Sequence, residues 1–292
     1  MGRWRNLVSC SLGLGKTPGS NPGRSIFKMP YKILYTADLH GNKKFYKKLI
    51  EKAKDTEIKA VVIGGDLSPR KTGTLEESID YQKEFLEKFF IPELSKLKKD
   101  IFFIPGNDDF RVNEPILKEQ NNDLKYINKI RCNISNKNIV GYGFVNPTPF
   151  RLKDWEKFED EGQKRPKQIF DYEIRTVKKE QSTIKEDLNN LIKLSNPKKT
   201  IYVMHAPPYN TNLDIINDGA HVGSSSIREF IERQQPYLTL HGHIHESPKM
   251  SGSFIDKIGN TICVNVGSSY PENKLNSIII DIDNLDIKYT EL

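Results

Sequence analysis

Apolar and polar positions along the chain follow two alternating patterns. From residue 32 onward, short runs of consecutive apolar residues are separated by stretches in which apolar residues recur at helical spacing. This alternation is typical of βαβ units and predicts an α/β fold rather than an all-α or all-β fold. The predicted strands are residues 33–36, 60–63, 101–104, 139–144, 201–205, 237–241, 261–266, 277–281 and 286–289.

Helical spacing between these strands predicts four helices. The first follows an N-cap at Asn42. The second spans residues 75–98 with a kink or break at Pro92, because proline has no backbone N–H and its ring clashes with the preceding turn. Capping-box spacing starts the last two helices, at Thr183 with Glu186 and at Ser226 with Glu229.

The positive charge of the 292-residue chain is concentrated at its N-terminus. The chain has 45 Lys+Arg and 38 Asp+Glu, and of its net charge of +7, residues 1–31 supply +5 and the remainder +2. The basic pI of about 9.0 therefore does not predict a nucleic-acid or membrane-surface partner. No apolar run approaches the roughly 20 residues of a membrane span.

We predict a disordered basic extension over residues 1–29, which are rich in Gly, Ser and Pro and have no hydrophobic periodicity. This extension is either an organellar transit peptide or an upstream segment before a functional start at Met29. Residues 30–292 are expected to form one domain, with the charged stretch 151–182 as an insertion over its surface. The cysteines have no Cys-x-x-Cys pair, which favours a reducing compartment and a cytoplasmic protein; they are Cys10, Cys132 and Cys263.

Residues able to bind metal follow five predicted strands at their carboxyl ends, where α/β sheets bind ligands. The candidate ligands are Asp38, His40, Asp66, Asn107, His205, His243 and His245. One residue separates Asp38 from His40 and His243 from His245, so an extended segment would place both side chains of each pair on the same side. Each motif alone has an ordinary explanation, but four of the six histidines fall in these loops, which favours one shared site.

Seven ligands, with one carboxylate shared, are enough for two four-ligand metal positions. A mixed set of imidazoles and carboxylates suits Mn, Fe, Ni or Zn, whereas all-oxygen ligands suit Mg or Ca. Two such ions about 4 Å apart form the clamp used in phosphoester hydrolysis. The sequence therefore predicts a hydrolase with two divalent metal ions.

The ordered motifs resemble those of the calcineurin-like metallophosphoesterase superfamily, over residues 31 to about 270. These motifs are Asp38-x-His40, Gly65-Asp66, Gly106-Asn107, His205 and Gly242-His243-x-His245. Segments 146–150, 205–208, 221–224 and 265–268 resemble more narrowly the branch of predicted phosphoesterases related to the Icc protein.

The resemblance implies a four-layer α/β/β/α sandwich and a metallophosphoesterase domain over residues 30–292. It implies two divalent ions, with Mn expected first and Fe, Ni or Zn as alternatives. A metal-bridging hydroxide would attack the phosphorus of a small phosphoester, as in a phosphodiesterase or a nucleotide phosphohydrolase. The implied ligands are Asp38, His40, Asp66 and His245 for the first ion and Asp66, Asn107, His205 and His243 for the second, with Asp66 bridging.

The chain departs from the family pattern directly after Asn107. Most members have a histidine there that assists the leaving group, and this chain has Asp108. An aspartate beside two cations should have a lowered pKa and be a poor proton donor. We therefore expect either substrates with good leaving groups, such as aryl or nucleotidyl esters, or another proton donor. The candidate is His221 in a Gly/Ser-rich loop, and an ordinary surface histidine is the alternative.

Two residues next to the candidate ligands, His241 and Asp109, are interpreted as structural residues rather than as metal ligands. His241 ends an apolar strand, so we interpret it as a hydrogen-bonded interior histidine rather than a ligand. Asp109 is expected to steady the Asn107 loop or to orient a ligand imidazole.

Two other functions stay open. A nuclease would need a basic groove, which only the Lys-rich stretch 151–200 could supply, so nucleic acid is not the expected partner. A catalytically weak or inactive protein-interaction module is the second alternative, because the resemblance includes a retromer subunit that uses this fold for assembly. Such a module should have lost ligands, and all seven are present. The oligomeric state is not predicted.

Overall fold

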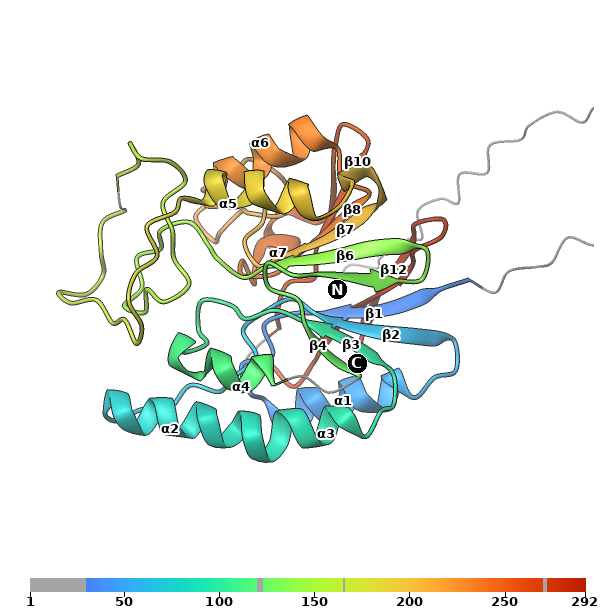
Figure 1. Ribbon diagram of the computed structural model, residues 1–292, viewed down its shortest axis with the longest axis horizontal. Coiled ribbons are helices and arrows are strands. Elements are labelled where there is room, and N and C mark those ends of the chain that lie inside the picture. The colour runs from blue at the N-terminus through green and yellow to red at the C-terminus, as the bar shows by residue number, and fades with distance from the viewer. Residues whose placement is uncertain (1–29, 120–122, 165, 270–271) are drawn as a thin grey trace, which may run out of the picture.

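The computed structural model describes residues 30–119, 123–164, 166–269 and 272–292. The predicted extension over residues 1–29 lies outside the described residues. Two six-stranded β-sheets pack against each other, with helices on their outer faces (Figure 1). This is the four-layer α/β/β/α sandwich that the resemblance implied. Among the described helices, none is both long and apolar enough to cross a membrane.

The first sheet has the strand order β12-β11-β1-β2-β3-β4. Strands β1 to β4 are parallel, and β11 and β12 extend one edge in the antiparallel sense. The strands are β1 (Lys32–Thr36), β2 (Ile58–Ile63), β3 (Asp100–Phe103), β4 (Leu124–Tyr126), β11 (Asn276–Asp281) and β12 (Asp286–Glu291).

The second sheet has the order β5-β6-β7-β8-β10-β9. Its four inner strands are parallel, and β5 and β9 are antiparallel edge strands. The strands are β5 (Arg131–Ile134), β6 (Lys137–Tyr142), β7 (Thr200–Met204), β8 (Leu238–His241), β9 (Ile255–Ile258) and β10 (Thr261–Asn265).

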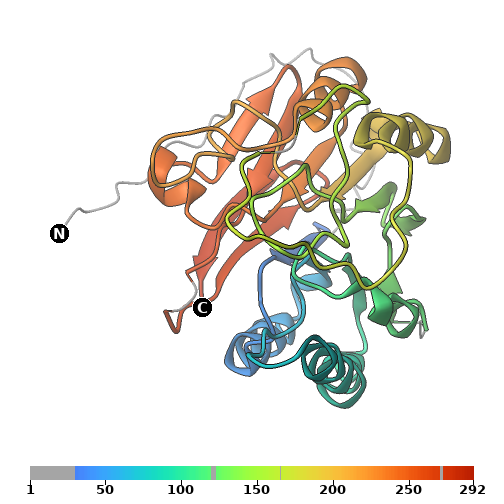
Figure 2. The ribbon, with the colours of Figure 1, turned by 90° about the vertical axis from the view of Figure 1, so that its left-hand side faces the viewer.

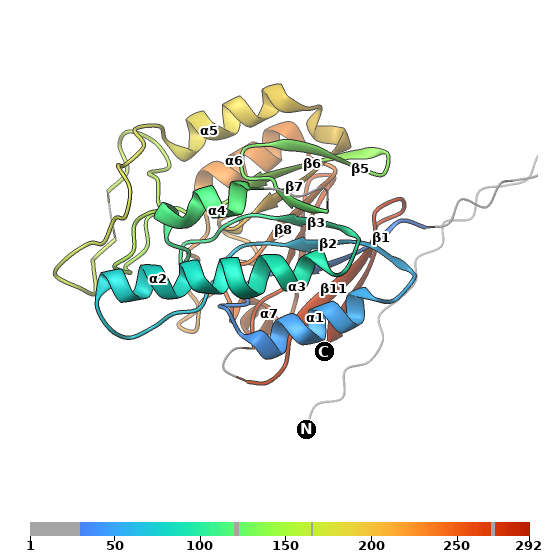
Figure 3. The same ribbon diagram turned by 60° about the horizontal axis from the view of Figure 1, so that its bottom comes forward.

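Helices α1, α2 and α3 cover the outer face of the first sheet, and α5 and α6 cover that of the second (Figures 1 and 3). The helices are α1 (Lys43–Ala53), α2 (Leu75–Phe85), α3 (Ile91–Ser95), α4 (Glu114–Lys118), α5 (Ile184–Leu191), α6 (Ser225–Gln234) and α7 (Ser247–Ser251). A π-helical segment joins α2 to α3 at Leu86–Phe90, and 3-10 turns lie at Arg111–Asn113, Ile192–Leu194 and Pro197–Lys199.

Three apolar clusters fill the three interfaces between the four layers. Strand residues such as Val62 and Leu240 pack between the two sheets, while Tyr46 and Tyr202 pack between a sheet and its helices. Strands buried on both faces read as continuous apolar runs, because no position faces water. This burial explains why the central strands were predictable from the sequence.

The strands that the sequence did not predict are β4, β5 and β9, and each lies at a sheet edge. An edge strand is short or partly polar because one side is open to solvent. β4 has three residues, and β5 places two exposed polar residues, Arg131 and Asn133, on alternate positions. The remaining predicted strands and the turn at Asp283-Asn284 are confirmed.

The helix predicted over residues 75–98 is shorter than expected, and its irregular segment does not lie at Pro92. Its helical residues end at Ser95, and its irregular part is the π-helical segment Leu86–Phe90, before Pro92. Pro92 lies in the first turn of α3, and the wider turn ahead of it accommodates its ring and missing N–H. The predicted break at Pro92 is therefore wrong in position.

The cap predicted for α6 is also wrong. The helix begins at Ser225, and the Ser224 hydroxyl accepts a hydrogen bond from the Ile227 backbone N–H at 3.1 Å. Ser226 lies inside the first turn. In contrast, the N-cap at Asn42 and the capping box at Thr183 are confirmed.

The stretch 151–182 is only partly a surface insertion. Figure 2 shows it (yellow-green) crossing the end of the molecule where the central strands of both sheets end. Residues 153–157 are nevertheless buried, with Lys153 and Trp155 essentially inaccessible to solvent. Trp155 packs against Phe144, with ring centroids 5.1 Å apart. The interpretation as a surface insertion is therefore wrong for residues 153–157. The charged composition of the stretch gave no indication that Trp155 would pack in the interior.

Candidate metal centre

The candidate ligands come from loops of both sheets. All seven follow strands that are neighbours within their sheet. Within each sheet their loops therefore lie side by side at the carboxyl ends of parallel strands. In the first sheet, Asp38 and His40 follow β1, Asp66 follows β2, and Asn107 follows β3. In the second sheet, His205 follows β7, and His243 and His245 follow β8. The Asp38 carboxylate accepts the His243 backbone N–H at 3.1 Å, which joins the two groups of loops.

Four candidate ligands have left-handed backbone conformations, which are unfavourable for side chains other than glycine. The φ angles are 56° at Asp38, 44° at His40, 51° at Asp66 and 66° at His243. Backbone hydrogen bonds hold them: Asp38 donates to the Gly65 carbonyl at 3.0 Å, and His40 to the Asp66 carbonyl at 2.9 Å. The expectation of extended Asp-x-His and His-x-His segments is thus wrong, and tight turns aim these side chains instead.

A first group of ligand atoms converges from Asp38, His40, Asp66 and His245. Their ligand atoms all lie within 4.8 Å of one another. Nε2 of His40 is 3.1 Å from Nε2 of His245 and 3.8 Å from Oδ2 of Asp66. Nε2 of His245 is 3.6 Å from Oδ1 of Asp38. This is the set that the resemblance implied for the first ion.

A second group lies on the other side of the Asp66 carboxylate. Nε2 of His205 is 3.4 Å from Oδ1 of Asp66 and 3.1 Å from Oδ1 of Asn107. The His205 Nδ1–H donates to the Gly64 carbonyl at 2.8 Å, which turns Nε2 toward the site. The ring of His243 lies 5.2 Å from that of His205. Asp66 therefore has one oxygen facing each group.

Glycine is required where the loop after β3 passes close to these side chains. A Cβ on Gly106 would lie 2.2 Å from Oδ1 of Asp66 and 2.6 Å from Nε2 of His205. Any larger residue would displace the carboxylate that faces both groups. The glycine of the Gly-Asn motif thus leaves room for the ligands.

The electrostatics of the cluster favour positive charge. Burial by itself lowers the pKa of His40, but Asp108, Asp66 and Asp38 raise it to about 9. Burial likewise lowers the pKa of His205, and Asp66 and Asp38 raise it to about 9. Burial opposes ionisation of Asp66, but His205 and His40 hold its pKa below the ordinary value. The carboxylates thus attract cations, and a divalent ion supplies that charge.

The donor set fits divalent metal ions. Asp38 and Asp66 are buried, and in the described part of the chain their ion-pair partners are histidines rather than Lys or Arg. Burial and the neighbouring His205 lower the pKa of His243 to about 4, so this imidazole is neutral and able to act as a ligand. Buried carboxylates without a permanent cation are costly unless a metal pairs with them.

Asp109 joins the loops that carry Asp66 and Asn107. Its carboxylate accepts backbone N–H groups from Leu67 at 3.1 Å, Ser68 at 2.9 Å and Gly106 at 2.9 Å. The interpretation that Asp109 steadies the Asn107 loop is therefore confirmed. Burial and the adjacent Asp66 raise the pKa of Asp109 to about 6.

A family model for calcineurin-like phosphoesterases matches residues 31–247, a span that contains all seven candidate ligands. The chain belongs to the calcineurin-like phosphoesterase family. An uncharacterized protein of Methanocaldococcus jannaschii is 33% identical over 257 residues, which cover 86% of this chain and 95% of that protein.

Solved structures of similar fold match about nine tenths of this calcineurin-like chain. A protein of Thermus thermophilus is 17% identical with a TM-score of 0.58, over 89% of this chain and 98% of that one. A dimetal phosphatase from Danio rerio is 10% identical with a TM-score of 0.58, over 90% of this chain and 96% of that one. At these identities the likeness shows the fold.

The aspartate that follows Asn107 in this calcineurin-like phosphoesterase lies beside the cluster. Oδ2 of Asp108 forms an ion pair with Nη2 of Arg70 and lies 3.2 Å from Nδ1 of His40. Its backbone N–H donates to Oδ1 of Asp66 at 2.9 Å. Arg70 was not predicted from the sequence, although a basic residue four positions after a candidate ligand was a visible signal.

His221 is paired with a buried carboxylate. Its Nδ1–H donates to Oδ1 of Asp214 at 2.7 Å, and its side chain is partly exposed. Its loop contacts the start of α7, where the Ile215 backbone N–H donates to the Ser247 hydroxyl at 3.0 Å. The sequence offered no signal for Asp214, which lies seven positions before His221 in an irregular loop.

His241 is an interior histidine, as interpreted from the sequence. Its Nδ1 is 2.8 Å from the Ala206 carbonyl, and its Nε2 is 2.8 Å from the Thr239 hydroxyl. Burial lowers its pKa to about 4. These partners occupy both ring nitrogens.

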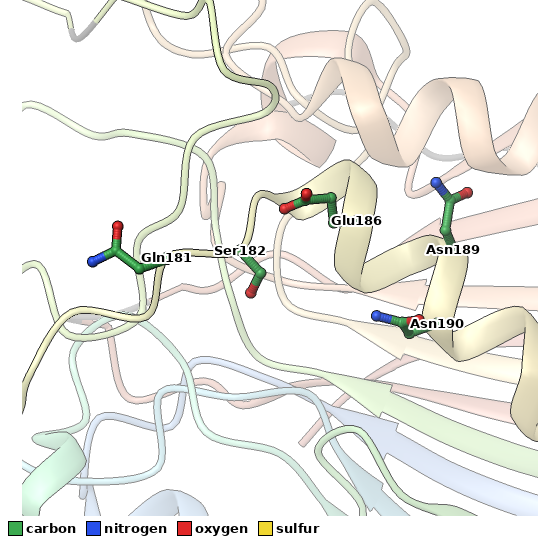
Figure 4. Close-up of a pocket in the computed structure, with 5 residues that line it drawn as sticks. All are labelled: Gln181, Ser182, Glu186, Asn189 and Asn190. Atoms are coloured by element: carbon green, nitrogen blue, oxygen red, sulfur yellow. The ribbon is translucent and has the colours of Figure 1, made fainter.

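A further cavity of about 550 Å³ lies near the start of α5 (Figure 4). The side chains that line it are Gln181, Ser182, Glu186, Asn189 and Asn190. Glu186 belongs to the capping box of Thr183, so its carboxylate is already used by the helix. Among the residues that the structure describes, those lining this cavity form no cluster of candidate metal ligands, unlike the loops that carry the motifs.

Proposed function

We propose that this chain is a dinuclear, metal-dependent phosphoester hydrolase. The observation that carries the proposal is the placement of Asp66, whose Oδ2 faces His40 and whose Oδ1 faces His205. A carboxylate in this position can bind two ions at once. The name of the Danio rerio relative, a dimetal phosphatase, agrees with two ions.

The proposed ligands divide into two sets that share Asp66. The first set is Asp38, His40, Asp66 and His245, and the second is Asp66, Asn107, His205 and His243. Two divalent ions, Mn first and Fe, Ni or Zn as alternatives, supply Lewis-acid polarisation of phosphoryl oxygens and a nucleophile from water near neutral pH. The protein orients the imidazoles: His205 by its bond to the Gly64 carbonyl, and His40 by the carboxylate of Asp108.

We propose a phosphodiester or a nucleotide as the substrate. A carboxylate, Asp108, occupies the place where most family members have a histidine, and this carboxylate is engaged in an ion pair with Arg70. An ionised carboxylate cannot protonate a departing alkoxide. Substrates with stable leaving groups, such as aryl or nucleotidyl groups, depend least on such a proton.

His221 is the proposed proton donor for poorer leaving groups. Because Nδ1–H is held by the buried Asp214, Nε2 is the atom left to deliver the proton.

His221→Ala should reduce turnover of an alkyl phosphodiester by about 100-fold, and that of a p-nitrophenyl ester by less than about fivefold. Steady-state kinetics over a leaving-group series measures this difference. Asn217→Ala, an exposed residue in the same loop, controls for loop disturbance. Equal turnover of wild type and His221→Ala with both esters would remove His221 from the mechanism.

The function is tested by metal content and hydrolysis together. Purified chain loaded with Mn should contain two ions and hydrolyse bis-p-nitrophenyl phosphate faster than p-nitrophenyl phosphate, and chelation should abolish both activities. Elemental analysis and p-nitrophenol release provide the readouts. No bound metal and no turnover after loading with Mn, Fe, Ni or Zn would contradict the proposal. That result would favour the interaction module, with residues 151–200 as the surface to probe.

A further inference from the structure

A buried amide at the end of β10 joins two loops of the proposed site. The Asn265 side chain is inaccessible to solvent, and its Nδ2 donates to the Leu213 carbonyl at 2.8 Å and to the Ile244 carbonyl at 3.1 Å. Its Oδ1 accepts the Gly267 backbone N–H at 2.9 Å. A side-chain amide has two N–H donors, so both are used, each on a different loop.

The Ile244 carbonyl belongs to the turn that carries two candidate ligands, His243 and His245. A second contact holds the same turn, because the Ser268 backbone N–H donates to the His245 carbonyl at 3.1 Å. A Cβ on Gly267 would lie 2.8 Å from that carbonyl, so the chain after β10 packs closely against the turn. One of the two amide hydrogen bonds therefore fixes the backbone between two candidate ligands.

The Leu213 carbonyl belongs to the loop that carries His221. Leu213 directly precedes Asp214, whose buried carboxylate accepts the Nδ1–H of His221 at 2.7 Å. The same carboxylate accepts the backbone N–H groups of Thr211 and Gly223, each at 2.9 Å. These bonds tie the loop to one carboxylate, so a contact at Leu213 also restrains His221.

The link between the two loops is one short, planar group, and its chemistry is specific. A hydroxyl in its place could donate to only one of the two carbonyls, and an apolar side chain to neither. Either change would leave a buried carbonyl without a donor. Because a displacement of about 1 Å can reduce a reaction rate about 100-fold, the link also matters for proton transfer between the loops.

We propose that Asn265 is a positioning residue that fixes the loop of His221 relative to the turn of His243 and His245. The proton donor and the metal centre then keep one separation. This inference rests on the proposed function and on His221 as its proton donor. Asn265 acts through His221, so its loss weakens protonation of the leaving group more than the attack on phosphorus.

The test compares two esters in the Mn-loaded chain. Asn265→Asp keeps the shape of the side chain and removes both N–H donors. The kcat for an alkyl phosphodiester should fall by at least about tenfold, and that for a p-nitrophenyl ester by less than about threefold. Added to His221→Ala, Asn265→Asp should leave the ratio of the two kcat values unchanged, because its effect acts through His221. If Asn265→Asp does not fold, Asn265→Ser, which keeps one donor, carries the same comparison.

Hydrogen exchange of the purified chain gives a readout that does not depend on turnover. The Val222 backbone N–H donates to the Asp214 carbonyl at 3.1 Å within the loop of His221. This amide should exchange at least about fivefold faster in Asn265→Asp, while the amides of β1 and β2 keep their wild-type rates. Uniformly faster exchange, or an unchanged rate at Val222, would show that Asn265 does not restrain the loop and would overturn the inference.

The matched control is Asn113→Asp. Asn113 is also buried, and its Nδ2 donates to the Ile79 carbonyl of α2 at 3.1 Å. Its variant loses the same kind of bond and should keep the wild-type ratio of alkyl to p-nitrophenyl turnover.

Three kinetic results would each overturn the inference and leave a metal-dependent hydrolase intact. These are unchanged kcat values in Asn265→Asp, an equal loss with both esters, or a selective loss that persists in the His221→Ala background. No turnover of the p-nitrophenyl ester by wild type would instead contradict the proposed function and the inference together. The failure of the inference is therefore distinguishable from the failure of the function.

Discussion

Replacing Asp66 with asparagine should reduce phosphodiester hydrolysis by about 1,000-fold or more and lower the metal content below two ions per chain. The substitution keeps the shape of the side chain but removes the charge whose oxygens face His40 and His205. Those histidines hold the pKa of Asp66 below its ordinary value although burial opposes this, so the site favours the carboxylate form. Elemental analysis and bis-p-nitrophenyl phosphate turnover of the Mn-loaded variant give the measurement.

Asp281→Asn is the matched control for this experiment. Asp281 is also buried, but it lies at the opposite end of the first sheet, where it is paired in register with Lys32 at the start of β1. Its Oδ1 accepts the Asp283 backbone N–H at 3.0 Å, a bond that asparagine can keep. Two bound ions and activity within tenfold of wild type in Asp66→Asn would show that Asp66 does not bridge.

Replacing Lys153 with methionine should destabilise the fold by about 3–5 kcal/mol. The Lys153 ammonium is buried, 2.8 Å from Oε1 of Glu156 and 2.7 Å from the Thr148 carbonyl. Without the lysine, the Glu156 carboxyl, whose pKa burial already raises, is left in the interior without its cation. Urea unfolding followed by circular dichroism measures the change.

The double variant Lys153→Met/Glu156→Leu separates the two contributions. It should recover much of the loss, because it removes the stranded carboxylate together with its partner. Lys88→Met removes an exposed lysine that pairs with Glu84, and it should change the stability by less than about 0.5 kcal/mol. A double variant as unstable as Lys153→Met alone would show that the lysine stabilises the fold through its other contacts.

The buried segment around Lys153 also supports the loop that carries Asn107. The indole N–H of Trp155 donates to the Asp109 carbonyl at 2.8 Å, and the Asp154 carboxylate accepts the Arg111 backbone N–H at 2.9 Å. Asp109 in turn holds the Asp66 loop through its contacts with Leu67 and Ser68. Loss of the buried ion pair should therefore affect the geometry of the proposed centre as well as stability.

The central strands and the candidate ligands were predictable because both depend on local sequence. Strands buried on two faces need continuous apolar runs, and ligand-bearing turns at their ends need glycine next to Asp, Asn or His. The structure brings together the loops at the carboxyl ends of β1, β2, β3, β7 and β8. The left-handed φ angles at Asp38 and His40 were not predictable, because contacts with the Gly65 and Asp66 carbonyls impose them.

The sequence alone determined the order of the central strands and of the helices between them, the family to which the chain belongs, and the residue types available at the strand ends. Tertiary structure alone decided which charged groups meet: Arg70 with Asp108, His221 with Asp214, and Lys153 with Glu156. The physical reason is that these contacts depend on the packing of the chain in space, which the local pattern of residues does not report. Periodicity reports the local environment of a residue, whereas an ion pair between separate loops, or one inside a charged segment that becomes buried, depends on how the layers pack around it.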